Sequence, residues 1–153
     1  MFIKISKVGN NQQVSTFILR KDMKRILIVE DNAFFMQFLK ETMHFRFPSI
    51  DMLEAANGEE AMQKIKTLSP EAILMDLRLP GENGLELTKK IKAQYPGIII
   101  VILTNYDLPE YREAAYQCGA DHFVSKDSFL SIIGSILTNH DTEKDNSNST
   151  GAH

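Results

Sequence analysis

From Lys24 onward the chain alternates between short apolar runs and longer segments with helical periodicity, and this alternation strongly constrains the fold. The short runs are rich in aliphatic and β-branched residues and cover 25–29, 50–55, 72–76, 98–103 and 122–125. The longer segments cover 33–45, 58–67, 84–95, 108–118 and 128–138. Strands that alternate with helices typically form a parallel sheet that is covered on both faces. We therefore predict an α/β fold with five parallel strands, each followed by a helix.

Two details refine this prediction. Run 50–55 mixes acidic with apolar residues, whereas the central runs are continuously apolar, so we place 50–55 at an edge of the sheet. Asn57 and Asn83 stand directly before the second and third helical segments, where an asparagine side chain can cap a helix.

The chain of 153 residues is long enough for one domain with a substantial core, which we assign to residues 24–138. Met23 followed by Lys24 looks like a natural domain start. Residues 139–153 are polar, so we expect a disordered tail and no output domain. Residues 1–23 form an extension that we expect to be frayed, with a small hairpin as the alternative.

Composition argues against several function classes. Residues 23–137 carry twelve basic and sixteen acidic groups, which gives no support to nucleic-acid binding. The longest wholly apolar stretch, 98–103, is far too short to span a bilayer. The single cysteine, Cys118, cannot form an internal disulfide, which is compatible with a reducing compartment. We therefore expect a cytoplasmic protein without membrane contacts.

Chemically useful side chains stand where four of the predicted strands end. They are Glu30 and Asp31, Asp76, Thr104 and Lys126. The carboxyl ends of parallel strands gather at one edge of the sheet, where ligands bind in open α/β folds. A carboxylate out of water needs a partner or a metal. Three carboxylates, a hydroxyl and an ammonium in one cleft therefore predict a site for Mg²⁺ and a phosphoryl group.

Five segments, taken in order, resemble the receiver domain of two-component response regulators. They are ILIVEDN (26–32), LMDLRLPG (74–81), NGLE (83–86), VILT (101–104) and GADHFVSK (119–126). The resemblance covers about residues 24–138. It implies the flavodoxin-like, doubly wound fold, a five-stranded parallel sheet of order 2-1-3-4-5 with helices on both faces.

The resemblance also implies a role for each site residue. Asp76 matches the phosphoacceptor, a carboxylate nucleophile. Glu30, Asp31 and Asp76 match the carboxylates that hold Mg²⁺, together with the backbone carbonyl at Arg78. Lys126 matches the lysine that pairs with the phosphoryl group. The alternatives are ordinary: Asp76 could form a strand-end turn, and Glu30 and Asp31 could serve the adjacent helix N-terminus.

Two further positions match the switch of the family. Thr104 matches the hydroxyl that binds a phosphate oxygen, and Phe123 matches the aromatic residue whose rotamer is coupled to it. We expect Phe123 to turn inward when Thr104 moves, with plain core packing as the alternative for Phe123. The sequence departs from many receivers at Asp127, where a proline is common, and phenylalanine at 123 lacks the tyrosine hydroxyl.

The first helical segment, 33–45, is unusually aromatic. Its periodicity predicts a core stripe made of Phe35, Phe38, Leu39, Thr42 and Met43. Phe34 falls beside this stripe and near the acidic cleft. In the family this helix face meets the four-helix bundle of the phosphodonor, so Phe34 is either a docking contact or a scattered surface residue.

Together these features predict a stand-alone receiver. It would accept a phosphoryl group on Asp76 from a sensor histidine kinase or a histidine phosphotransfer protein, with Mg²⁺, and signal to an unidentified downstream protein. It would be a phosphoacceptor with at most slow self-dephosphorylation rather than an enzyme. The alternatives are a receiver-fold interaction module that works without phosphorylation, and an aspartyl-phosphate phosphohydrolase, which Arg78 disfavours because those enzymes carry a second acid there. A homodimer formed on phosphorylation stays open.

Overall fold

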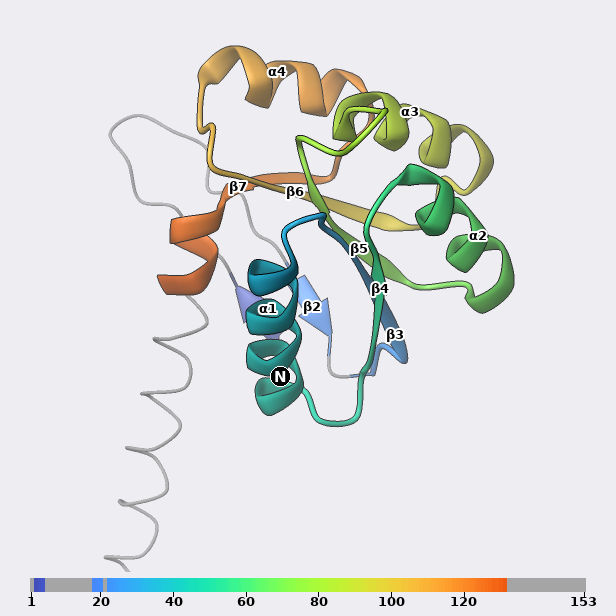
Figure 1. Ribbon diagram of the computed structural model, residues 1–153, viewed down its shortest axis with the longest axis vertical. Coiled ribbons are helices and arrows are strands. Elements are labelled where there is room, and N and C mark those ends of the chain that lie inside the picture. Colours follow the sequence, from blue (N-terminus) through green and yellow to red (C-terminus); the bar gives the residue numbers. More distant parts are fainter. Residues whose placement is uncertain (1, 5–17, 21, 132–153) are drawn as a thin grey trace, which may run out of the picture.

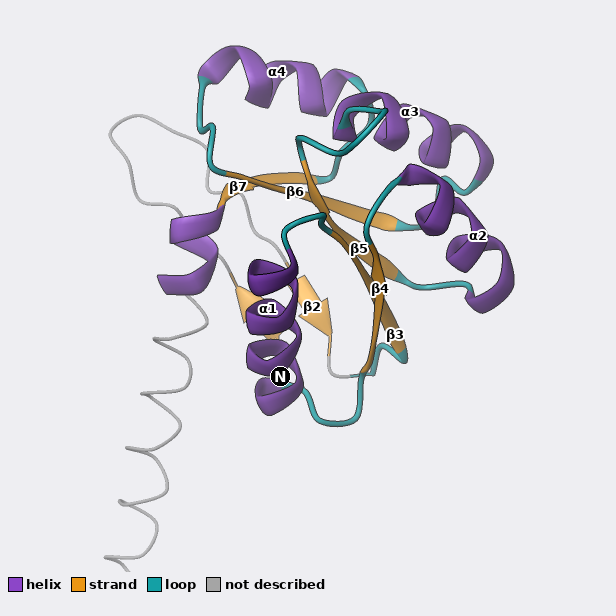
Figure 2. Cartoon of the chain, viewed as in Figure 1, coloured by secondary structure: helices purple, strands orange, loops and turns teal. Residues whose placement is uncertain are grey.

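The computed structural model describes residues 2–4, 18–20 and 22–131. Its main body is a parallel sheet of five strands with helices on both faces (Figure 1; Figure 2). The strands are β3 (Arg25–Val29), β4 (Asp51–Ala55), β5 (Ala72–Asp76), β6 (Ile99–Thr104) and β7 (His122–Ser125). The helices are α1 (Ala33–Arg46), α2 (Gly58–Leu68), α3 (Gly84–Gln94) and α4 (Pro109–Gln117), and residues 126–131 are also helical.

The strand order is β4-β3-β5-β6-β7 with every pair parallel, which confirms the predicted order 2-1-3-4-5. The mixed strand β4 lies at an edge, as its sequence predicted. Charged side chains cover that edge. The Lys64 ammonium donates to the backbone carbonyl of Glu54, and Lys40 forms an ion pair of 2.9 Å with the Glu54 carboxylate. Charged groups of this kind protect an edge strand from pairing with another chain.

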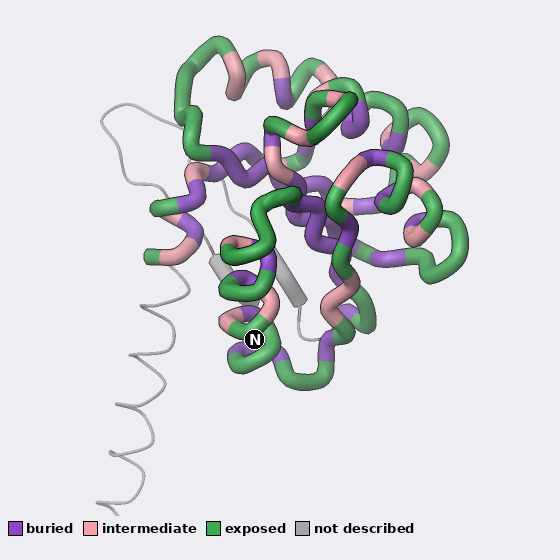
Figure 3. The backbone as a smooth tube through the Cα atoms, in the orientation of Figure 1, coloured by how far each residue is buried: buried purple, intermediate pink, exposed green. Residues whose placement is uncertain are grey.

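Two apolar layers hold the helices to the sheet. Because side chains alternate along a strand, Ile26 and Ile28 of β3 face the layer that contains α1 and residues 126–131. Leu27 and Val29 face the opposite layer, which contains α2, α3 and α4. The central strands β3, β5 and β6 are largely buried, whereas the edge strand β4 and the outer helix surfaces are more exposed (Figure 3).

The predicted core stripe of α1 is wrong at one position. Leu39 and Met43 are buried and Phe35 is half-buried, but the Phe38 side chain is 51% exposed. The buried face of α1 is formed by Met36, Leu39, Met43 and Arg46, and Phe38 does not lie on that face. Residue type alone could not decide which face of α1 is buried, since neighbouring faces both carry aromatic side chains.

Asparagine side chains cap three helices. The side-chain oxygens of Asn57 and Asn83 accept from the Glu60 and Glu86 amides at 2.9 and 2.8 Å, as predicted. For α1 the cap is Asn32, which accepts from Phe35 at 3.0 Å. Asp31 therefore does not supply this cap.

The described parts of the N-terminal extension are two short strands. β1 (Phe2–Lys4) and β2 (Ile18–Arg20) pair as a separate antiparallel sheet, which agrees with the hairpin alternative, and residues 5–17 between them lie outside the described residues. This pairing joins segments that lie more than ten residues apart, and the strand propensity of each segment alone does not predict whether they pair. The last helix begins at residue 126 rather than 128, because the Ser125 hydroxyl accepts the Ser128 amide at 3.1 Å.

The predicted continuation of that helix to residue 138 and the predicted tail, 139–153, lie outside the described residues. Within the described ranges, none of the helices has the length and apolar character needed to cross a bilayer.

Candidate functional site

The predicted site residues come together at the carboxyl ends of the central strands. The loops after β3, β5 and β6 leave the sheet on the same side (Figure 1). Glu30 and Asp31 follow β3, Asp76 is the last residue of β5, and Thr104 is the last residue of β6. Lys126 is the first residue after β7 and begins a helix.

The three acidic residues form a compact cluster. One carboxylate oxygen each from Glu30, Asp31 and Asp76 lies within 4.8 Å of the other two. Glu30 is buried, Asp76 is half-buried and Asp31 is exposed, so the cluster reaches from the interior to the surface. Carboxylates with room for water on one side suit Mg²⁺, which keeps several waters and takes few protein ligands. The donor set therefore fits a divalent cation.

Lys126 supplies the positive charge of the site. Its ammonium lies 3.0 Å from Oε2 of Glu30 and 3.6 Å from Oδ2 of Asp76. Lys126 is itself buried, at 8% exposure. A single ammonium therefore faces two carboxylates in a poorly hydrated place, and it lies closer to Glu30 than to Asp76.

The pKa of the Glu30 carboxyl is raised to about 7, chiefly because the group is buried and in addition because of the nearby charge of Asp76, while Lys126 and the Asn32 amide act in the opposite direction. Clustered carboxylates repel one another, and this repulsion raises the pKa of a member of the cluster. For Glu30 the loss of hydration is the larger cause and outweighs the repulsion between acids.

The Thr104 hydroxyl is fully buried at the end of β6. Its oxygen accepts the backbone N–H of Tyr106 at 2.9 Å. A threonine hydroxyl can accept and donate simultaneously, so its proton is still available for an acceptor in the site.

Arg78 lies near Asp76 through its backbone and near Tyr106 through its side chain. Its N–H donates to Oδ1 of Asp76 over 3.4 Å, and its guanidinium lies 3.9 Å from the centre of the Tyr106 ring. The loops after β5 and β6 thus meet above the site. The predicted role of the Arg78 carbonyl as a metal ligand stays a prediction.

Phe123 is buried, at 2% exposure, and its expected movement with Thr104 stays a prediction. The guanidinium of Arg112 lies 5.1 Å from the Phe123 ring and donates to the Phe123 carbonyl at 3.3 Å. Arg112 also pairs with Asp107 at 2.8 Å. Arg112 therefore links the Phe123 ring and carbonyl to the loop that carries Asp107.

Sequence reasoning missed three contributors: Gly84, Phe35 and Arg112. A Cβ at Gly84 would overlap the backbone carbonyl of Asp76, so only glycine lets α3 start against the end of β5. The Phe35 ring centre lies 4.3 Å from the Lys126 ammonium. Asn83-Gly84 was a recognisable signal, whereas nothing local in the sequence indicates the contacts of Phe35 or Arg112.

Comparison with known proteins agrees with this geometry. The model of the response regulator receiver domain matches residues 26–138. The chain is 32% identical over 119 residues to the chemotaxis protein CheY of Halobacterium salinarum, a match that covers 75% of this chain and 98% of that protein. Other curated relatives are longer, and the chain spans 54% and 30% of two of them.

Solved structures show the same fold. A CheY-like receiver domain protein from Methanospirillum hungatei superposes with a TM-score of 0.64 at 28% identity, covering 80% of this chain and 99% of that one. The Mn²⁺-bound form of the response regulator Rcp1 gives a TM-score of 0.63 at 25% identity, covering 72% and 90%. The family match, the strand order and the acidic cluster agree, and the chain belongs to the response regulator receiver domains of two-component signal transduction.

Proposed function

We propose that this receiver accepts a phosphoryl group on Asp76 from a phosphohistidine, in a Mg²⁺-dependent reaction, and that the phosphoryl group changes its contacts with a downstream protein. The donor would be a sensor histidine kinase or a histidine phosphotransfer protein. The observation that carries the proposal is the setting of Asp76. It is a half-buried carboxylate beside two other acids, with the Lys126 ammonium 3.6 Å from Oδ2.

The transfer is a displacement at phosphorus. A carboxylate oxygen of Asp76 forms the new O–P bond, the N–P bond of the phosphohistidine breaks, and its electron pair returns to the imidazole nitrogen, which takes up a proton. Lys126 is placed to neutralise charge on the transferred oxygens, and it needs only to turn from Glu30 toward the phosphoryl group. Positioning and charge stabilisation are the main protein contributions to such transfers.

Glu30, Asp31 and Asp76 would hold the Mg²⁺, with the Arg78 carbonyl as a fourth ligand from the chain. When bound, Mg²⁺ neutralises charge on the phosphoryl oxygens and orients them for displacement. The related regulator Rcp1, solved in a Mn²⁺-bound form, supports a divalent cation in this fold. Self-dephosphorylation of Asp76 would be slow, since no second acid follows at position 78 to activate water.

The switch would run through the loop after β6. For Thr104 to donate to a phosphoryl oxygen and move toward it, the bond from the Tyr106 N–H to its hydroxyl must lengthen. Movement of Tyr106 would also displace its neighbour Asp107. Asp107 forms an ion pair with Arg112, and Arg112 donates to the Phe123 carbonyl, so the displacement would reach Phe123. Phosphorylation is known to act through local charge on an element with two arrangements.

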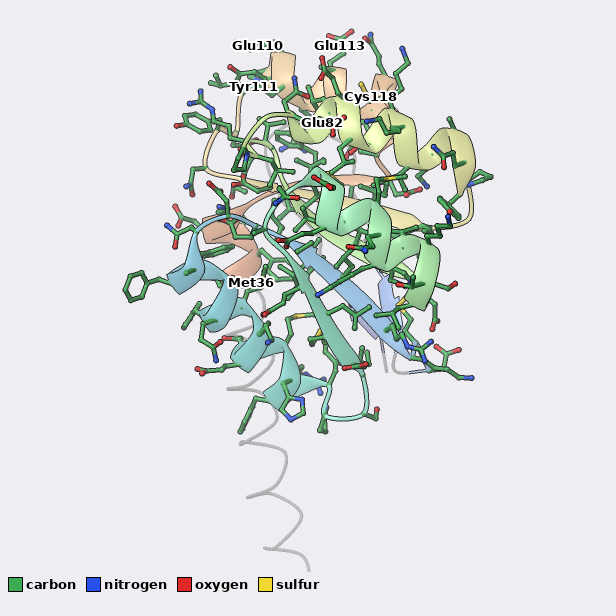
Figure 4. All side chains as sticks on the ribbon, turned by 45° about the vertical axis from the view of Figure 1, so that its right-hand side comes forward. Met36, Glu82, Glu110, Tyr111, Glu113 and Cys118 are labelled. Carbon is green, nitrogen blue, oxygen red and sulfur yellow. The ribbon has the colours of Figure 1, made fainter. Side chains whose placement is uncertain are left out.

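A partner would read the nearby surface of α4. Glu110 and Glu113 are exposed and extend from α4 away from the sheet, and Tyr111 lies half-buried beside them (Figure 4). This surface adjoins the loop that carries Tyr106, so a shift of the loop alters both its shape and its charge.

The phosphodonor would dock on the start of α1. Phe34 is 90% exposed and Phe38 is 51% exposed, and they lie one helical turn apart in the first half of α1, which begins shortly after Glu30 and Asp31. Two exposed phenylalanines on one face suit the apolar groove of a helical bundle. Phe34→Ala should slow transfer from a phosphohistidine protein by about tenfold and leave transfer from acetyl phosphate unchanged. Phe45→Ala, at the far end of the helix and 72% exposed, is the matched control.

Uptake of phosphate tests the proposal directly. The full chain is incubated with acetyl phosphate, with and without Mg²⁺, and its intact mass is measured. We expect one added phosphoryl group that requires Mg²⁺ and maps to Asp76. A mass that stays unchanged under all conditions would contradict the proposed function.

A further inference from the structure

An aromatic ring closes one side of the Lys126 ammonium. The ammonium lies 4.3 Å from the centre of the Phe35 ring, 3.0 Å from Glu30 and 3.6 Å from Asp76. Phe35 comes from the first turns of α1, and Lys126 comes from the start of the last described helix. The contact therefore joins two helices that flank the site on the same face of the sheet.

We propose that Phe35 is a positioning residue, whose ring holds the Lys126 ammonium within reach of the phosphoryl group on Asp76. This inference rests on the proposed phosphorylation of Asp76. The ring acts on the transfer through Lys126 and touches neither the donor nor the reacting atoms.

The physical need for such a contact follows from the lysine itself. An ammonium on a four-carbon stem is a flexible point charge, and burial removes the water that would hydrate it. Glu30 attracts it strongly, and a further carboxylate in place of the ring would compete with the phosphoryl oxygens. The face of an aromatic ring attracts a cation more weakly than a carboxylate does, and it carries no net charge. Phe35 thus supports the ammonium while it remains able to turn toward Asp76.

The ring is well placed for this role because its backbone is fixed. The Phe35 N–H donates to the Asn32 side chain at 3.0 Å, and the side chain packs against the apolar layer of α1. The neighbouring aromatic residues Phe34 and Phe38 are exposed, and within the described part of the chain Phe35 is the aromatic residue found over the Lys126 ammonium.

The test compares Phe35→Leu with Phe35→Tyr in the full chain. Leucine keeps an apolar side chain but loses the ring, whereas tyrosine keeps the ring. With acetyl phosphate and saturating Mg²⁺, we expect the rate constant for Asp76 phosphorylation to fall about three- to tenfold in Phe35→Leu and to return in Phe35→Tyr. Phe45→Leu, the same change on an exposed part of α1, should leave the rate unaltered.

Two readouts separate positioning from general destabilisation. In NMR spectra the ε-methylene protons of Lys126 should show an upfield ring-current shift that Phe35→Leu abolishes and Phe35→Tyr retains. In a Lys126→Met background, Phe35→Leu should have no further effect on the rate, because the residue through which it acts is gone.

The outcomes also distinguish this inference from the proposed function. Normal phosphorylation of Phe35→Leu, or an equal loss of rate in the Lys126→Met background, would overturn the positioning role alone. A wild-type chain that takes up no phosphate would overturn the proposed function, and the positioning role with it.

Discussion

The Lys126 ammonium and the Glu30 carboxylate form a buried ion pair of 3.0 Å that links the last described helix to the end of β3. The same ammonium is 3.6 Å from Asp76, so its charge acts both on Glu30, its closer partner, and on the proposed phosphoacceptor. A buried ion pair contributes little net stability because both charges lose hydration. Its value here is the placement of a movable cation beside the proposed phosphoacceptor.

Asp76→Asn should abolish phosphate uptake and preserve the fold. The amide has nearly the same shape but is not a nucleophile, and it removes one negative charge from beside Glu30 and Asp31. The free energy of unfolding should stay equal or rise by up to about 1 kcal/mol. Intact mass after acetyl phosphate treatment and urea unfolding measure the two effects. The control is Asp51→Asn, at the start of β4 and therefore at the other edge of the sheet from the site. Phosphate uptake on another residue in Asp76→Asn would refute the assignment of Asp76 as the phosphoacceptor.

Asp31→Ala should weaken Mg²⁺ binding by about tenfold or more, because it removes a hard oxygen ligand. Asn32 caps α1, so the loss cannot be ascribed to a missing cap. Glu41→Ala removes an acid from the outer side of α1, where Glu41 accepts from Gln37, and it should leave the affinity close to that of the wild type. Titration calorimetry measures the Mg²⁺ affinity of both variants. Equal losses of affinity in Asp31→Ala and Glu41→Ala would show that the acidic cluster does not bind the metal.

Glu30 should make the metal-free protein less stable as pH rises. Its pKa is about 7 in the folded protein against a usual value of 4.5, so between these values the folded state binds more protons than the unfolded state. The contribution of Glu30 is then fully present below pH 4.5 and is lost as pH rises through 7.

The Glu30→Gln variant isolates this contribution. Relative to that variant, the wild type should lose on the order of 2 kcal/mol of unfolding free energy between pH 4 and pH 8. Mg²⁺ should reduce the loss, because a cation favours the ionised carboxylate. If the unfolding free energies of the two proteins change by the same amount between pH 4 and pH 8, the raised pKa of Glu30 is contradicted.

Thr104→Ala should leave phosphorylation of Asp76 largely intact and uncouple it from the α4 surface. Alanine removes the hydroxyl that would donate to the phosphoryl group, and it leaves the Tyr106 N–H without its present acceptor at a cost of about 1 kcal/mol. NMR shifts of residues 106–125 on phosphorylation provide the measurement, with Thr104→Ser as the variant that keeps the hydroxyl. If the alanine variant still shows the full set of shifts, the switch does not pass through Thr104.

Much of the fold could be predicted because its determinants are local. The apolar runs and helical periods of residues 24–131 predicted every strand of the main sheet, and the mixed run at 50–55 correctly indicated an edge. Asn57 and Asn83 were recognisable as caps because a cap bonds to an amide three residues away. The convergence of Glu30, Asp76 and Lys126 could be predicted because the carboxyl ends of parallel strands lie at one edge of the sheet, whereas the spacing of these residues in the sequence does not indicate it.

Only the tertiary structure decided features that depend on contacts between distant segments. Phe38 was expected in the core and is exposed, because the direction of α1 against the sheet is set by packing. Phe123 lies buried and its carbonyl accepts from Arg112, a contact between residues 11 apart in the chain that no local pattern indicates.

The sequence by itself determined the βα alternation, the caps and the set of acidic, hydroxyl and ammonium groups at the strand ends, because period and spacing are local properties. The tertiary structure decided which carboxylate Lys126 pairs with, which ring lies over its ammonium and how strongly burial raises the pKa of Glu30. Those outcomes depend on distances and hydration, which arise only when β3, β5, α1 and the last described helix are packed together.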